Sequence, residues 1–313
     1  MKLLIKQQRM RLLILLVCLG IVSCTRLVNA QNIPSSYRHQ VMVSDVRRDE
    51  DTNDTCEDTI TSFPDALQNL AKADVVYLGE THDRLEDHHI QLQIIQELQQ
   101  RNRKIAIAME MFVQPYQNII NRYLAGKLTE QELVEQSNYQ QWGYPWEYYA
   151  PIVRFAREKQ LPILALNIPI EITRKVTRSG LESLTPQERK LIPPFSEIRT
   201  DNAQYRQLLA NTFKQHQHSG HGSSTGFERF FLAQVLWDET MASQVTKFLK
   251  ANPNYQVIVL AGQGHIIHGY GIPSRVARRV QDKRIIQCSI LLSPTQEKPG
   301  NSKQASADFV WQQ

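Results

Sequence analysis

The stretch Ala73-Asp-Val-Val-Tyr-Leu-Gly-Glu-Thr-His-Asp83 joins a short apolar run to a cluster of polar side chains. Its β-branched and aromatic run, residues 75–78, is typical of a buried strand and ends at a glycine. Glu80 and His82 follow at once, and a helical pattern then covers residues 86–101. A buried strand that delivers a carboxylate and an imidazole to the start of a helix predicts a site at the carboxyl edge of a parallel sheet.

The rest of the chain repeats this alternation of strand and helix. Further apolar runs that predict strands covered on both faces span residues 105–112, 162–168, 256–261 and 284–292. Helical patterns separate them, over residues 114–124, 129–136, 149–159, 201–215, 226–250 and 274–281. The pattern predicts an α/β fold with a mainly parallel central sheet flanked by helices. The segment between the third and fourth strands is too long for one crossover, so we expect a helical insertion at about residues 170–250. A short last strand, 308–311, is expected at the sheet edge.

The charge of the chain is concentrated at its start. Its 313 residues carry a formal charge of +5, and the lysines and arginines of residues 1–23 supply four of those positive charges. The remainder is nearly neutral and contains no lysine or arginine run of the kind that nucleic-acid binding requires. We therefore expect no nucleic-acid partner.

The first 23 residues are typical of a secretion signal, with a basic start and an apolar run at 12–22. The run is about half the ~20 residues of a membrane-spanning helix. Two cleavage sites compete: Ile21-Val-Ser-Cys24 resembles a bacterial lipobox, and Val28-Asn-Ala30 resembles an ordinary signal-peptidase site. The positive charge of Arg26 disfavours the second. We expect a lipoprotein that is exported and anchored in a membrane of the bacterial cell envelope through lipidated Cys24.

The segment that follows the signal is polar. Residues 24–61 are expected to form a flexible tether, and residues 62–313 the folded domain. Apart from Cys18 and the lipidation candidate Cys24, the chain has two cysteines, Cys56 and Cys288, which an oxidising compartment would allow to pair, although sequence does not show that they approach each other.

Polar side chains recur where the predicted strands end. Glu80 and His82 follow the first strand, Glu110 lies within the second, Asn167 ends the third and His265 follows the fourth. Three of them have an ordinary structural alternative: a helix cap or a salt bridge for Glu110, a core position for His265 and a turn for Asn167. Because the ends of parallel strands meet at one edge, their coincidence favours a common site.

Three further features lie on predicted helices. His88 is closer than His89 to the apolar stripe of its helix, so His88 is the better candidate for the site. Asp238 shares a helix face with apolar residues, and a buried carboxylate needs a partner. Trp142 belongs to an aromatic cluster at 142–149, which is expected either in the core or around a flat ligand.

These residues together resemble the ChaN-like haem-binding uptake lipoprotein family, over residues 66–292. The motifs that carry the resemblance are Val76-Tyr-Leu-Gly-Glu-Thr-His-Asp83, His88-His89, Gln91, Ala108-Met-Glu-Met111, Trp142, Tyr149-Ala-Pro151, Leu166-Asn-Ile-Pro169, Gln234, Trp237-Asp-Glu-Thr-Met241, Leu260-Ala-Gly-Gln-Gly-His265 and Gly271-Ile-Pro273. A more distant similarity links them to the Tiki/TraB and erythromycin-esterase-like group. The resemblance implies a lipid-anchored α/β domain that binds haem, takes part in haem or iron uptake and forms a homodimer with haem at its interface.

Two site hypotheses remain open. For haem, one axial histidine or tyrosinate and apolar walls suffice, and the candidate cofactor-binding residues are His88, Tyr149, Asn167, Asp238 and Trp142.

The alternative is a metal-dependent hydrolase. There the strand-end side chains would be both the catalytic residues and the ligands of a divalent transition metal: Glu80, His82, Glu110 and His265.

Overall fold

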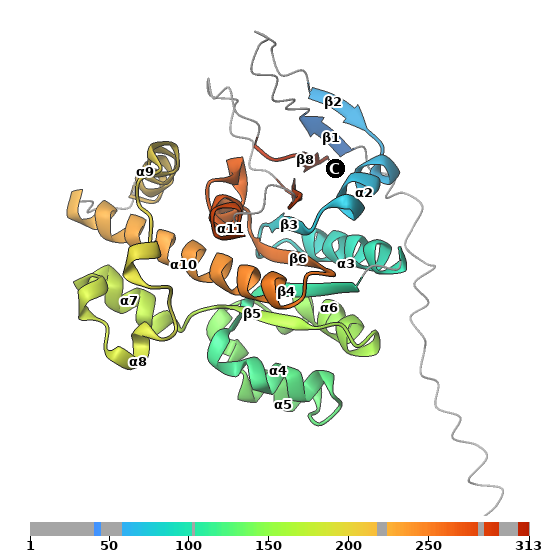
Figure 1. The fold of residues 1–313 in the computed structure, drawn as a ribbon, viewed down its shortest axis with the longest axis horizontal. Coiled ribbons are helices and arrows are strands. Elements are labelled where there is room, and N and C mark those ends of the chain that lie inside the picture. The colour runs from blue at the N-terminus through green and yellow to red at the C-terminus, as the bar shows by residue number, and fades with distance from the viewer. Residues whose placement is uncertain are drawn as a thin grey trace, which may run out of the picture. The chain divides into compact units, whose positions relative to one another are not determined.

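The computed structural model describes residues 41–44, 58–101, 104–217, 224–280, 285–293 and 306–312 (Figure 1). By its contacts the chain divides into two units, Met1–Arg38 and His39–Gln313, and every described residue belongs to the second. The predicted signal segment, the lipidation at Cys24 and Cys56 lie outside the described residues. Cys288 is buried with a free thiol, whose pKa burial raises. None of the helices in the described ranges is long and apolar enough to cross a membrane.

The centre of the domain is an eight-stranded sheet in the order β2-β1-β8-β7-β3-β6-β4-β5. Its strands are β1 (Val41–Ser44), β2 (Asp58–Thr61), β3 (Val75–Glu80), β4 (Lys104–Val113), β5 (Ile163–Asn167), β6 (Tyr255–Gly262), β7 (Gln287–Leu291) and β8 (Phe309–Trp311). The six strands from β8 to β5 are parallel, whereas β1 is antiparallel to both β2 and β8. The predicted α/β fold with a mainly parallel sheet is confirmed.

Two details of the predicted strand layout are corrected. Residues 41–44 and 58–61 were expected in a flexible tether but form β1 and β2, so the sheet begins before residue 62. β8 was expected at the sheet edge but lies between β7 and β1. Both corrections have one cause: β1 pairs with β8, about 270 residues later in the chain, and no local pattern signals such a pairing.

Helices cover both faces of the sheet. They are α2 (Phe63–Lys72), α3 (Leu85–Gln100), α4 (Gln117–Leu124), α5 (Glu130–Gln136), α6 (Trp146–Glu158), α7 (Ile170–Ser179), α8 (Pro186–Arg189), α9 (Ala203–Gln217), α10 (Ser224–Ala251) and α11 (Ile272–Val280). Short 3-10 turns are η1 (Gln114–Tyr116), η2 (Tyr139–Trp142), η3 (Leu181–Ser183), η4 (Phe195–Glu197), η5 (Gln263–His265) and η6 (Ile267–Gly269). Helices α2 to α6 pack on one face, and α10 and α11 on the other. Helices α7 to α10 lie between β5 and β6, which confirms the predicted helical insertion.

The alternation of side chains along β3 explains its continuous apolar run. Val76 and Leu78 face the core under α3 and α6, while Val75 and Tyr77 face the core under α10 and α11. Both faces are buried, so every position is apolar until the strand ends. The same alternation places Glu80 on the α3/α6 face.

Strand β4 changes register just before it ends. Met109 pairs with Ala165 but Val113 pairs with Asn167, so β4 has two more residues than β5 in this interval. The pairing of β4 with β6 stops at Met109. A bulge of this kind re-aims side chains, and here it lies at Glu110, whose carboxylate reaches the backbone N–H of Gly262 at the end of β6.

Candidate functional site

The first part of the site is built around Glu80, the last residue of β3. Its carboxylate is buried and accepts hydrogen bonds from the Tyr149 hydroxyl (2.5 Å) and the Gln91 amide (2.6 Å). The same carboxylate lies 2.8 Å from Nδ1 of His82. Three separate elements, α3, α6 and the loop after β3, therefore converge on one buried carboxylate, as a buried charge requires.

His82 is the part of this group that reaches solvent. Its side chain is 24% exposed, and its ring lies edge-on to Trp142 (4.9 Å) and tilted against Tyr144 (5.1 Å). Burial lowers the pKa of His82, but the hydrogen bond to Glu80 and the charges of Glu80 and Glu110 outweigh it, so the net pKa is raised. Because Nδ1 is engaged by Glu80, Nε2 is the nitrogen left for a ligand or a proton transfer.

The second part of the site is a chain of alternating carboxylates and imidazole. Glu110 accepts a hydrogen bond from the Gly262 N–H (2.8 Å) and lies 3.3 Å from Nε2 of His265. Nδ1 of His265 lies 2.6 Å from Asp238, whose other oxygen accepts from the Tyr205 hydroxyl at 2.5 Å. Both ring nitrogens of His265 thus face carboxylates, so both donate and the ring is an imidazolium.

The protonation of this chain follows from its contacts. Burial lowers the pKa of His265, but the adjacent Glu110 and Asp238 carboxylates raise it to about 10. Burial raises the pKa of Glu110, but His265, His82 and the Gly262 N–H together lower it to about 2. At neutral pH Glu110 and His265 are a fixed ion pair.

The two parts meet at Gly262. A Cβ atom added there would lie 2.9 Å from Nε2 of His82 and 3.8 Å from a carboxylate oxygen of Glu110. Only glycine leaves room for His82 to approach Glu110 at this position. The four side chains Glu80, His82, Glu110 and His265 are therefore brought together, as the strand-end pattern predicts.

Their arrangement differs from a metal site. In the described ranges, no three histidine, cysteine, aspartate or glutamate side chains are placed to hold a metal ion. In this arrangement Glu80 pairs with His82, and Glu110 pairs with His265. The prediction of a divalent transition metal held by these four residues gains no support from this geometry.

The predicted cofactor-binding residues differ in how deeply they are buried. Trp142 is partly exposed beside His82, whereas Tyr149 and Asp238 are fully buried behind the two carboxylate–imidazole pairs. Asn167 donates to the Glu110 carbonyl (3.1 Å) and accepts from the Ile168 N–H, so its amide holds the bulge of β4.

The two adjacent histidines of α3 separate as the helical pattern predicts. His88 is buried, stacks against Tyr148 (5.3 Å) and has Nε2 3.1 Å from the carbonyl of His82, while His89 is exposed. His88 therefore supports the residue that reaches solvent.

Several supporting residues were assigned no role from sequence. Gln91 lies three residues after His88, so helical spacing could have placed it beside Glu80. Tyr205 and Arg275 lie on α9 and α11, and nothing in their local sequence links them to Asp238. Only the packing of α9 and α11 against α10 brings them there.

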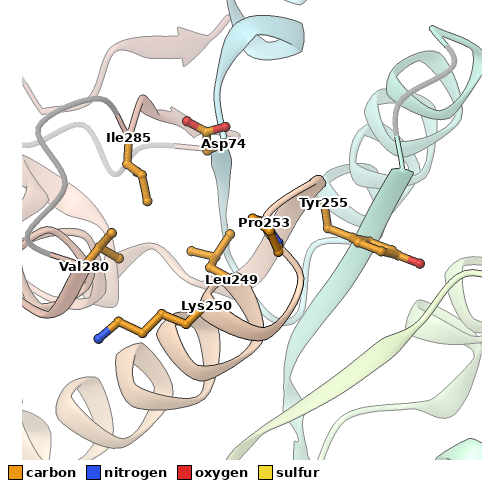
Figure 2. Close-up of a pocket in the computed structure, with 7 residues that line it drawn as sticks. All are labelled: Asp74, Leu249, Lys250, Pro253, Tyr255, Val280 and Ile285. Atoms are coloured by element: carbon orange, nitrogen blue, oxygen red, sulfur yellow. The ribbon is translucent and has the colours of Figure 1, made fainter.

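A separate cavity lies at the amino ends of the strands, opposite the site (Figure 2). It has a volume of about 460 Å³, and its lining includes Asp74, Leu249 and Tyr255. Asp74 precedes β3 and Tyr255 begins β6, so this cavity is at the amino ends of the strands. It shares no residue with the site.

Comparison with known proteins shows which family this chain resembles. The chain matches the family described as haem-binding uptake, Tiki superfamily, ChaN, over residues 66–276. ChaN of Campylobacter jejuni, a structure described as cofacial haem binding, superimposes with a TM-score of 0.63 at 18% identity, covering 88% of this chain and 98% of that one. At this identity the superposition shows the fold.

Two further similarities are weaker or partial. A mutant of erythromycin esterase EreC in its open conformation matches with a TM-score of 0.47 at 16% identity, covering 80% of this chain and 78% of that one. The Arabidopsis thaliana protein RETICULATA-RELATED 5, chloroplastic, is 26% identical over 263 residues, covering 78% of this chain. The match spans only 34% of that relative's length.

Proposed function

The chain belongs to the haem-binding uptake, Tiki superfamily, ChaN family, and we propose that it binds haem at the exposed side of His82. One observation carries the proposal. A partly exposed imidazole is held between a buried carboxylate and two aromatic rings, those of Trp142 and Tyr144. Haem needs one axial ligand and apolar walls, and His82 with these two rings offers both.

The contacts restrict which side chain can ligate the iron. Both nitrogens of His265 face carboxylates. The Tyr149 hydroxyl donates to Glu80, and burial with the Glu80 charge raises its pKa, which disfavours a tyrosinate. His82 and Tyr144 are both partly exposed and remain candidates. Bound haem would supply an iron centre, and Glu80 would fix the ring of His82 through Nδ1.

A haemin titration of the full chain followed by Soret absorbance tests this proposal. We expect saturable binding by the unmodified chain and by His89→Ala, which removes an exposed imidazole next to the site. Loss of the Soret shift in His82→Ala but not in Tyr144→Phe assigns the iron to His82, and the reverse result assigns it to Tyr144. Equal binding by the unmodified chain and both variants would refute haem binding beside His82.

Export, lipid anchoring at Cys24, a role in haem or iron uptake and a homodimer belong to the same proposal. They are supported by the lipobox-like Ile21-Val-Ser-Cys24 and by the family. Metabolic labelling with palmitate in a bacterial host should mark the full chain and not Cys24→Ala. Sedimentation with and without haemin should show whether haem changes the association of two chains. Labelling of both chains would contradict lipidation at Cys24.

A second candidate is hydrolysis by proton transfer at the same residues. Its specific support is that Glu80 lies 2.8 Å from Nδ1 of His82 and that the charge of Glu110 also raises the pKa of His82. An imidazole so placed can take a proton from a water molecule, as a general base does. This version of the hydrolase does not depend on the metal ligands predicted from sequence.

Chromogenic esters and peptides, assayed with and without a chelator, test this candidate. Activity that is unaffected by the chelator and lost in His82→Ala supports proton transfer. Activity that needs an added divalent metal would instead support the metal-dependent hydrolase, and no activity above that of His82→Ala would refute both.

A further inference from the structure

A buried cluster of charges lies behind His265, between α10 and α11. Asp238 and Glu239 are adjacent on α10 and fully buried. Three arginines of α11 contact them: Arg275, Arg278 and Arg279. One of these three, Arg275, also contacts the segment that carries His265.

Arg275 joins three elements through one guanidinium group. Its Nη1 donates to the carbonyls of Tyr270 (2.5 Å) and Gly271 (2.9 Å), at the end of the loop that begins after β6. The same nitrogen lies 3.9 Å from Asp238, the carboxylate that faces His265. The guanidinium also lies over the ring of Tyr205 at 5.2 Å.

The loop between β6 and α11 is tightly packed against itself. A Cβ atom at Gly271 would lie 2.1 Å from the carbonyl oxygen of His265, so the two ends of the loop touch. His268, between them, adopts a left-handed backbone conformation with φ of 56°. A shift of the Gly271 end therefore moves His265 as well.

We infer that Arg275 is a positioning residue, which holds the loop at residues 263–271 so that His265 stays between Glu110 and Asp238. Nη1 of the guanidinium binds both loop carbonyls, while Nε of the same planar group lies 3.3 Å from Glu239 and the charge of the group balances Asp238. Lysine keeps that charge, but its single ammonium group cannot make the Nη1 and Nε contacts together. The positioning role itself does not depend on the proposed function. Only its effect on ligand binding does, because the Glu110–His265 pair adjoins His82.

Proton NMR of the full chain without haem tests the inference. The 2.6 Å contact between Nδ1 of His265 and Asp238 predicts a slowly exchanging, downfield Nδ1–H resonance, assigned by its disappearance in His265→Gln. We expect Arg275→Lys to lose this resonance. Arg278→Lys is the matched control, because Arg278 contacts Glu239 (2.7 Å) and the Glu197 carbonyl on the exposed side of the cluster. It should keep the resonance.

A resonance that survives in folded Arg275→Lys would overturn the inference. If that variant does not fold, the unmodified chain provides the test: the Nη1 protons of Arg275 should exchange slowly with solvent, and fast exchange would overturn the inference. A haemin titration of the same variants separates the two proposals. If the resonance behaves as expected while the unmodified chain fails to bind haemin, the positioning role stands and the proposed function fails.

Discussion

Two carboxylate–imidazole pairs stand at the same edge of the sheet, and their surroundings differ sharply. Glu80–His82 lies on the α3/α6 side, where the imidazole is 24% exposed and touches aromatic rings. Glu110–His265 lies on the α10/α11 side, where the imidazole side chain is 9% exposed and is held at both nitrogens. The same two residue types thus give one pair that is open to a ligand and one that is closed.

The difference shows that, at one edge of a sheet covered on both faces, one pair can contribute to stability while the other contacts a ligand. The closed pair is an internal ion pair, which stabilises only while its partners stay in place. It adjoins the open pair across Gly262, so it can set the charge around His82 without touching a ligand. Changes to the closed pair should therefore affect stability most, and changes to the open pair should affect binding most.

Removal of Asp238 should produce the largest effect. Asp238 is fully buried, and Asp238→Ala leaves the His265 imidazolium without its closest carboxylate. We expect the free energy of unfolding to fall by about 3–5 kcal/mol, measured by urea denaturation. Asp83→Ala, which removes an exposed carboxylate, should change it by less than about 0.5 kcal/mol. Equal effects of the two variants would contradict the closed pair.

A change of pH should weaken the closed pair from both sides. The raised pKa of His265, about 10, gives a stability contribution that is complete below the ordinary value of 6.5 and is lost as the pH rises through about 10. The lowered pKa of Glu110, about 2, gives a contribution that is present above the ordinary value of 4.5 and is lost as the pH falls through about 2.

Urea denaturation between pH 6 and pH 10 measures the alkaline loss. His265→Gln should be markedly less sensitive to pH over this range, whereas His89→Ala, which removes an exposed imidazole and keeps both pairs, should follow the unmodified chain. The same sensitivity in all three proteins would show that His265 is not the group that titrates.

Three glycines, one at the end of β6 and two in the loop that follows, test the comparison between the two pairs. A Cβ at Gly262 meets the His82 ring at 2.9 Å, so Gly262→Ala should cost about 1–3 kcal/mol of unfolding free energy through overpacking. Gly271→Ala should cost more, because the added atom meets the backbone of His265 at 2.1 Å. Gly264→Ala is the control, since nothing lies within 4 Å of its added Cβ. Any other order of thermal stability would contradict these contacts.

Removal of the open imidazole should produce the smallest change in stability. His82→Ala removes one partner of Glu80, which keeps its hydrogen bonds to Tyr149 and Gln91. We expect a loss of about 1 kcal/mol by urea denaturation. His89→Ala, at an exposed position of the same region, should leave stability unchanged. A loss in His82→Ala as large as that in Asp238→Ala would remove the distinction between the pairs.

Much of the sheet could be predicted because its signals are local. The strands β3, β4, β5 and β6 are apolar runs covered on both faces, and such runs stand out in sequence. The same locality separated His88 from His89, since helical spacing alone decides which of two neighbours faces the core.

Strands β1 and β2 were missed for the opposite reason. Each is four residues long, and β2 reads Asp58-Thr-Ile-Thr61, with too little apolar pattern to predict a strand. They form because β8 offers a pairing edge from the far end of the chain. The bulge of β4 at Glu110 likewise depends on β5 and β6 and leaves no mark in the sequence around it.

The sequence by itself determined the α/β class and the placing of Glu80, His82, Glu110 and His265 at one edge, because each apolar run and its polar end are local signals and the carboxyl ends of parallel strands meet at one edge. The tertiary structure alone decided that these residues form two pairs, one open and one closed. Tyr149 reaches Glu80 across 69 residues, and Glu110 reaches Gly262 across 152. Buried charges are satisfied by whatever groups the packing brings within hydrogen-bond distance, and packing is a property of the whole fold.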